Sequence, residues 1–155
     1  MFISEDIIDA VILKLETADF EQEVAILGEK QPVLLGYVLS EDFELLTNAE
    51  REWLLYLVLV VYQAVESGYK KIDPLSKNDL EAAEEANFAR LETITAKRFR
   101  DRMTPFFEGY PQEDLLAFVE DSLTEDEEDT ENFLTKEGRE PMFVALKSVI
   151  DVLTN

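Results

Sequence analysis

The chain has 155 residues, 46% of them hydrophobic, which is enough material for one domain with a real core. It contains no Cys and no His, so disulfide frameworks, Ser-His and Cys-His triads and zinc sites built on thiolate or imidazole are excluded. The formal net charge of -21 argues against nucleic acid as a ligand, because phosphate groups would be repelled from most of the surface.

The first third of the chain is predicted to form short helices. Ser4 can cap a helix in which Ile8 and Val11 lie on the same apolar face. A second short helix is expected to stop at Gly28, and a third to begin at Pro32, which is tolerated in a first turn. With only five Gly and five Pro in the chain, the composition favours helices over the tight turns of a sandwich or barrel.

A long central helix is predicted next. Thr47 and Glu50 have the Thr-x-x-Glu spacing of a capping box, and the residues from Trp53 to Val65 are apolar on almost every side. This apolar run is shorter than the roughly twenty residues that span a bilayer, so we expect no membrane segment. The N-terminus is acidic where a secretory signal is basic, and together with the absence of Cys this predicts a cytoplasmic protein.

The second half begins after a predicted linker over residues 70–78, where Pro74 interrupts the pattern. We expect a helix that begins at Ser76 or Asn78 and continues to Pro105, and a short helix beginning at Pro111. The last helix is predicted to begin near Pro141 and to keep one wet face, which could serve as a contact in a homodimer.

Two heptapeptides, LTNAERE at 46–52 and LTKEGRE at 134–140, indicate an internal repeat. An offset of about 81 residues also aligns several residues of the two halves, and the offset grows to about 88 past an acidic run. We therefore predict a tandem duplication, with units 1–69 and 79–155, packed as a closed pseudo-symmetric pair in one all-α domain of about six to eight helices. The alternative is a chance alignment of Leu-rich helices. The aligned pairs are Gly28 with Gly109, Gln31 with Gln112 and Tyr37 with Phe118.

The repeated heptapeptide supplies the first candidate site. Capping explains Thr47 and Glu50 in the first copy, whereas in the second copy Gly138 replaces the glutamate and the capping box is expected to be lost. The Arg-Glu pairs remain in both copies. Either each Arg binds a carboxylate or the carbonyls that end a preceding helix, or the pairs form a symmetric recognition site. The residues concerned are Arg51, Glu52, Arg139 and Glu140.

A second group of candidates is the acidic run, which could bind a basic partner or could simply be solvated. It lacks the spacing and the Gly of an EF-hand loop, so we expect no metal there. The basic segment 97–102 is expected to pair with acidic helices or with this run rather than with RNA. The acidic candidates are Glu125, Asp126, Glu127, Glu128 and Asp129.

Three functions remain from this reading. The first is a non-catalytic acidic interaction protein of inhibitor, immunity or adaptor type that binds a basic protein partner. The second is a small-molecule or lipid-binding module with an apolar pocket between the repeats. The third, a hydrolase using paired carboxylates, is disfavoured because nothing singles out a pair, and no cofactor is expected. The pocket candidates are Phe106, Phe107, Tyr110 and Phe118.

Overall fold

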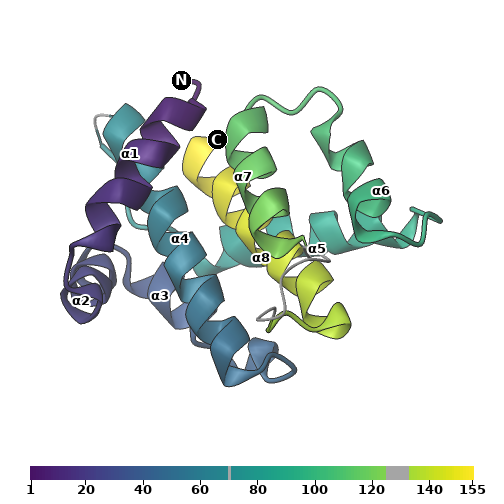
Figure 1. The fold of residues 1–155 in the computed structure, drawn as a ribbon, viewed down its shortest axis with the longest axis horizontal. Coiled ribbons are helices and arrows are strands. Elements are labelled where there is room, and N and C mark those ends of the chain that lie inside the picture. The colour runs from purple at the N-terminus through teal and green to yellow at the C-terminus, as the bar shows by residue number, and fades with distance from the viewer. Residues whose placement is uncertain (70, 125–132) are drawn as a thin grey trace.

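A computed structural model of the chain describes residues 1–69, 71–124 and 133–155 (Figure 1). Within these ranges all regular structure is helical, in eight α-helices and two short 3-10 helices, so the predicted all-α class is confirmed. The elements are α1 (Glu5–Glu16), α2 (Phe20–Lys30), α3 (Pro32–Val38), η1 (Glu41–Phe43), α4 (Asn48–Gly68), α5 (Lys77–Glu92), α6 (Phe99–Met103), η2 (Thr104–Phe107), α7 (Glu113–Leu123) and α8 (Lys136–Thr154).

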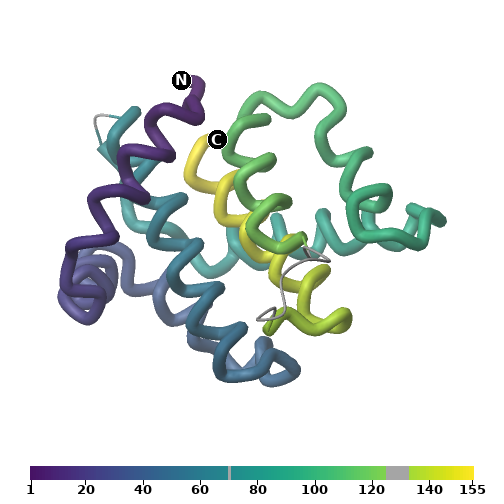
Figure 2. Tube along the Cα trace, viewed as in Figure 1, coloured from purple at the N-terminus to yellow at the C-terminus, as the bar shows by residue number. Residues whose placement is uncertain are grey.

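The core is built around α4 and α8, the two longest helices, which run side by side through the middle of the molecule (Figure 2). Helix α1 packs on α4, whereas α5 and α7 pack on α8. Every residue from Leu57 to Val65 in α4 is buried, and so is every residue from Met142 to Ile150 in α8. The central position predicted for the first of these helices is therefore confirmed.

The helices begin at the polar residues that the sequence indicates. Ser4 accepts a hydrogen bond from the backbone N–H of Ile7 at the start of α1, and Ser76 accepts one from Asp79 at the start of α5. Thr47 and Glu50 form the predicted capping box of α4. These caps satisfy backbone N–H groups that have no partner inside the helix.

Several predicted limits differ from the structure. Gly28 lies inside α2, where a Cβ would be 2.8 Å from the Leu35 side chain, so its role is close packing of α2 on α3. The helix expected to reach Pro105 ends at Glu92, and a separate α6 follows. The predicted linker 70–78 includes the cap and the first two residues of α5.

The last helix differs most from its prediction. It begins at Lys136, capped by Thr135, and Pro141 lies inside it. Pro141 removes one helical hydrogen bond, to the carbonyl of exposed Glu137, while the buried apolar run beyond it continues the helix. The expected wet face is also wrong, because Lys147 is only 6% exposed and α8 is covered by its neighbours. The homodimer stays a prediction, without this helix as its surface.

The extended segments before α1 and α5 are each held by a buried glutamine. Gln112 accepts from the N–H of Ile3 at 3.0 Å and donates to the carbonyl of Met1 at 2.6 Å. Gln31 accepts from the N–H of Leu75 at 2.8 Å and donates to the carbonyl of Asp73 at 3.0 Å. The two glutamines therefore make the same pair of backbone hydrogen bonds.

None of the described helices is both long enough and apolar enough to cross a membrane.

Candidate functional site

The first sequence-derived candidate lies at the start of the two central helices. The Glu50 carboxylate is fully buried and accepts a hydrogen bond from the Thr47 N–H at 3.0 Å. It also accepts from the N–H and the hydroxyl of Thr135, both at 3.0 Å. The second capping box is therefore not lost, because Glu50 takes the place of the missing glutamate for α8 as well. The hydrogen-bonding capacity of this buried carboxylate is used within the protein, so a partner cannot reach it.

The Arg-Glu pairs have different surroundings in the two copies. Arg51 donates to the carbonyl of Phe43, at 3.2 Å, which fixes the turn before α4, and Glu52 is exposed. Glu140 pairs with Arg102, which also donates to the carbonyls that follow α5, and Arg139 is half-buried. The carbonyl contact of Arg51 is of the turn-fixing kind expected from the sequence.

The charged runs are accounted for only in part. Arg100 pairs with Glu120 and Asp121 of α7, at 2.7 and 3.1 Å, and Arg102 pairs with Glu140. The expected internal pairing of segment 97–102 is thus confirmed for two of its arginines. The acidic candidates at 125–129 lie outside the described residues.

The four aromatic pocket candidates do not gather around one cavity. Phe106 is completely buried and packs against Phe143, with the ring centroids 5.4 Å apart. Tyr110 and Phe118 line two different clefts, and Phe107 is half-buried against the core. Phe106 and Phe107 therefore serve as ordinary core.

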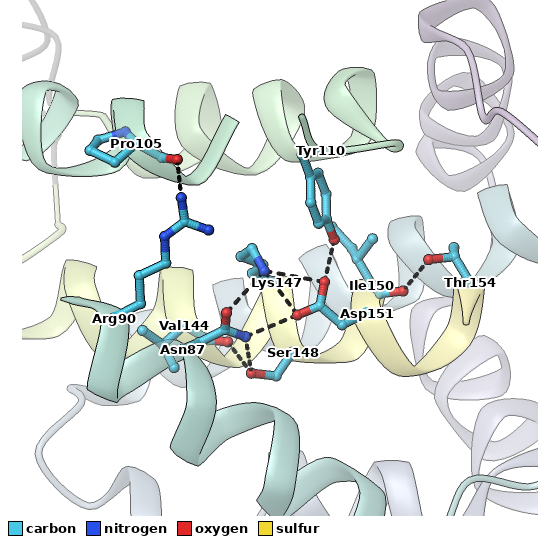
Figure 3. Close-up of polar contacts among 10 residues, drawn as sticks. All are labelled: Asn87, Arg90, Pro105, Tyr110, Val144, Lys147, Ser148, Ile150, Asp151 and Thr154. Carbon is cyan, nitrogen blue, oxygen red and sulfur yellow. Dashed lines mark hydrogen bonds and ion pairs between the residues drawn. The ribbon is translucent and has the colours of Figure 1, made fainter. Parts of the chain in front are cut away.

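A buried polar network links α5 and the segment before α7 to α8 (Figure 3). Lys147 donates to Asn87 and to Asp151, both at 2.9 Å, and its ammonium lies 4.7 Å from the centre of the Tyr110 ring. Asp151 also accepts from the Tyr110 hydroxyl, at 2.6 Å, and from Asn87, while Asn87 donates to Ser148. Burial and the nearby Asp151 charge raise the pKa of Tyr110, so it remains a donor. With these groups engaged by one another, we assign the network to packing rather than to proton transfer.

The strongest candidate site is a cleft of about 580 Å³ that sequence reasoning missed. We call it the α3–α5 cleft, because α3, the segment 40–42 and α5 form its walls. Its apolar surface comes from Val33, Gly36 and the Tyr37 ring, because Leu80, although it lines the cleft, is only 1% exposed. Its acidic groups are Glu41, Asp42, Glu81 and Glu84.

One hydrogen bond fixes the polar side of this cleft. The Tyr37 hydroxyl donates to the Glu84 carboxylate, and the Tyr37 ring packs edge-on against Phe43 at 5.4 Å between centroids. Burial, followed by the bond to Glu84, raises the pKa of Tyr37, so the hydroxyl stays protonated at neutral pH. Glu84 is thereby held in place while the charge of the rim remains negative.

The cleft has one cation among its lining residues, and it is bound only loosely. Lys77 lies at the edge of the cleft, 3.7 Å from Glu81, and both side chains are well exposed. Exposed pairs at this spacing contribute little to stability, so Lys77 can exchange for another cation at small cost. Among the described residues no three acidic side chains are grouped closely enough to hold a metal ion. The arrangement favours an organic cation with an apolar stem.

The sequence contained one weak signal for this site. Leu80, Glu81 and Glu84 fall at the helical spacing that places an apolar residue beside two acids on the same side of α5. The contact with α3, far away in the sequence, carried no such signal. Searches for a matching family model, for a similar characterised protein and for a similar solved structure find no match to the chain.

Proposed function

We propose that this protein is a non-catalytic helical interaction protein that binds a basic protein partner through the α3–α5 cleft. The observation that carries the proposal is a hollow with an apolar floor and four carboxylates at its edge. The whole chain supports it electrostatically, with 35 Asp and Glu against 14 Lys and Arg. Such a field accelerates the encounter with a positively charged surface and repels acidic competitors.

The chemistry of the cleft fits an Arg or Lys side chain. Both have an apolar stem, which can cover Val33 and the Tyr37 ring, and a cationic head that can reach Glu81 and Glu84. Arg is the better occupant, because its planar guanidinium can bind a carboxylate through two parallel hydrogen bonds. The partner is therefore expected to place an exposed Arg in this cleft.

The test uses a short fluorescein-labelled peptide whose Arg residues are spaced by Gly and Ser. Fluorescence anisotropy should show binding that weakens as the salt concentration rises from about 0.05 to 0.5 M. Glu81→Lys is expected to weaken binding about tenfold, because it puts a positive charge where the cation would sit. The control is Glu29→Lys, which makes the same change of net charge at an exposed site on α2.

Two outcomes would contradict the proposal. Equal weakening by both variants would mean that the peptide responds to net charge alone and does not use the cleft. Equal binding of a peptide with Gln in place of Arg would show that the cleft does not recognise a cationic side chain. The cytoplasmic location expected from the cysteine-free composition forms part of the same proposal.

The small-molecule alternative stays a prediction. Its four aromatic candidates lie in the core or in separate clefts, so no observation favours it over the acidic cleft.

A further inference from the structure

A second cleft, of about 330 Å³, lies between α1 and α7. We call it the α1–α7 cleft. Ala117 and Phe118 supply its apolar surface, because Ile8 is only 2% exposed. No Lys or Arg is among its lining residues, although Arg100 pairs with Asp121. Its acidic groups are Glu5, Asp9, Asp114 and Asp121.

Each of the seven residues that line the α1–α7 cleft has a counterpart in the lining of the α3–α5 cleft, whereas Glu41, Asp42 and Glu84 of the α3–α5 cleft have none in the other. Along α1 and α5, an offset of about 72 residues pairs Ile8 with Leu80 and Asp9 with Glu81. Along α3 and α7, the offset of about 81 pairs further lining residues of the two clefts. Each cleft thus joins the first helix of one half to the third helix of the other. The further pairs are Val33 with Asp114, Gly36 with Ala117, Tyr37 with Phe118 and Ser40 with Asp121.

The glutamine contacts give the same relation independently of the clefts. Gln31, in the first half, holds the segment at 73–75 that leads into α5, and Gln112, in the second half, holds the segment at 1–3 that leads into α1. The same 72-residue offset relates the two held segments, and the 81-residue offset relates the two glutamines. A reciprocal exchange of this kind is what an approximate twofold relation between the halves produces.

The join between the halves fits that relation too. The Glu50 carboxylate accepts hydrogen bonds from the N–H groups of Thr47 and Thr135. These two threonines cap the two central helices and occupy the same position in the repeated heptapeptide. One carboxylate therefore serves both equivalent helix starts. The second half differs by extra residues between α5 and α7 and again between α7 and α8, and for this reason one offset does not align the halves throughout.

We infer that the α1–α7 cleft is a second site at which a basic protein partner places an Arg side chain. This inference rests on the proposed function. The charge of the rim is the main argument. Of its four carboxylates, Asp121 pairs with Arg100 and Asp114 accepts from the N–H of Glu5. The carboxylates of Glu5 and Asp9 make no ion pair with any described residue, and Glu5 stands where Lys77 stands in the other cleft.

Two-dimensional ¹H–¹⁵N NMR of the whole chain, titrated with the Arg peptide, reads the two clefts separately. We expect amide signals at Gly36 and Glu84 to move for the α3–α5 cleft, and those at Asp9 and Ala117 to move for the α1–α7 cleft. Native mass spectrometry is expected to count two peptides bound per chain. Far-ultraviolet circular dichroism of each variant checks that the exposed substitutions leave the helices intact.

Single charge reversals then separate the sites. Asp9→Lys is expected to abolish the shifts of the α1–α7 cleft alone, Glu81→Lys those of the α3–α5 cleft alone, and each to reduce the count from two to one. Shifts confined to the α3–α5 cleft would overturn this inference and leave the proposed function standing. Shifts in neither cleft would overturn both, and Glu29→Lys, as the matched control, must leave both sets of shifts unchanged for the inference to hold.

Discussion

Glu50 and Gly138 face each other across the two central helices so closely that a Cβ at position 138 would lie 2.1 Å from the Glu50 carboxylate oxygen. Glu50 can cap α8 only because the third residue of that helix has no side chain. The glycine in the second heptapeptide thus leaves free the space that the glutamate of the first heptapeptide occupies. A shared cap ties the start of α4 to the start of α8.

This shared cap predicts an unusual sign for one substitution. Gly→Ala in a helix ordinarily stabilises by about 1 kcal/mol, but Gly138→Ala is expected to destabilise because it displaces the Glu50 carboxylate. Glu50→Ala is expected to cost about 2–4 kcal/mol, since it leaves the Thr47 and Thr135 N–H groups without their acceptor. Urea unfolding of both single variants and the double variant measures their coupling.

The control is Gly36→Ala, where a Cβ would meet nothing within 4 Å and a small stabilisation is expected. In the Glu50→Ala background, Gly138→Ala is expected to lose most of its cost. Strict additivity of the two substitutions would show that the carboxylate and the glycine are not coupled.

The glutamine contacts predict a matched pair of effects. Gln31→Ala and Gln112→Ala each remove two hydrogen bonds to an extended segment, at buried positions, and each is expected to cost about 2–3 kcal/mol. Hydrogen exchange should show faster opening of the first turn of α5 in the first variant and of α1 in the second. A loss of protection at the same helix in both variants would contradict the reciprocal arrangement.

The stability that an ion pair contributes is expected to depend on its burial, and the Lys147–Asp151 pair allows this to be tested. Lys147→Met is expected to lower the free energy of unfolding by about 2–3 kcal/mol, because Asn87 and Asp151 lose a charged donor inside the protein. Lys30→Met breaks the Lys30–Glu66 pair, which has the same 2.9 Å separation but is exposed, and is expected to cost under about 1 kcal/mol. Thermal melts of the two variants compare them directly. Equal losses would mean that burial does not decide the worth of the pair.

Two tyrosines predict a loss of stability at alkaline pH. Burial is the main cause of the raised pKa of Tyr37 and Tyr110, to which Glu84 and Asp151 add respectively. The unfolded chain releases these protons near pH 10 while the folded chain keeps them, so the free energy of unfolding falls as pH rises. The slope is about 1.4 kcal/mol per pH unit for each residue.

Urea unfolding at about pH 9 and pH 11 tests this for the wild type and for the Tyr37→Phe/Tyr110→Phe double variant. The variant is expected to lose less stability between the two pH values, whatever its stability at the lower one. An identical loss in both proteins would show that these hydroxyls do not hold their protons in the fold.

Local signals in the sequence predicted three of the helix starts. Ser4, Ser76 and the Thr47–Glu50 box cap helices as expected, because a cap depends on residues within one turn. Limits set by tertiary packing were missed. Gly28 makes room for Leu35 from the next helix, and the buried run after Pro141 carries α8 through a proline.

The candidate site was missed for a related reason. The α3–α5 cleft joins segments more than thirty residues apart, and no local pattern predicts which acids will share an edge with Val33 and Leu80. The duplication predicted from the heptapeptide and Gln31 stays a prediction, and its second unit was placed at 79–155, after the start of α5. The 72-residue offset between Ser4 and Ser76 becomes visible only once both are seen to cap helices.

The most direct test of the central claim, that the α3–α5 cleft binds a basic protein, is affinity capture from a lysate of the source cells on immobilised chain, eluted by salt rising from about 0.05 to 0.5 M. Wild-type chain and Glu29→Lys are expected to release the same basic protein, and Glu81→Lys to release much less of it. Retention of that protein by Glu81→Lys at the wild-type level, or capture of acidic proteins only, would contradict the account.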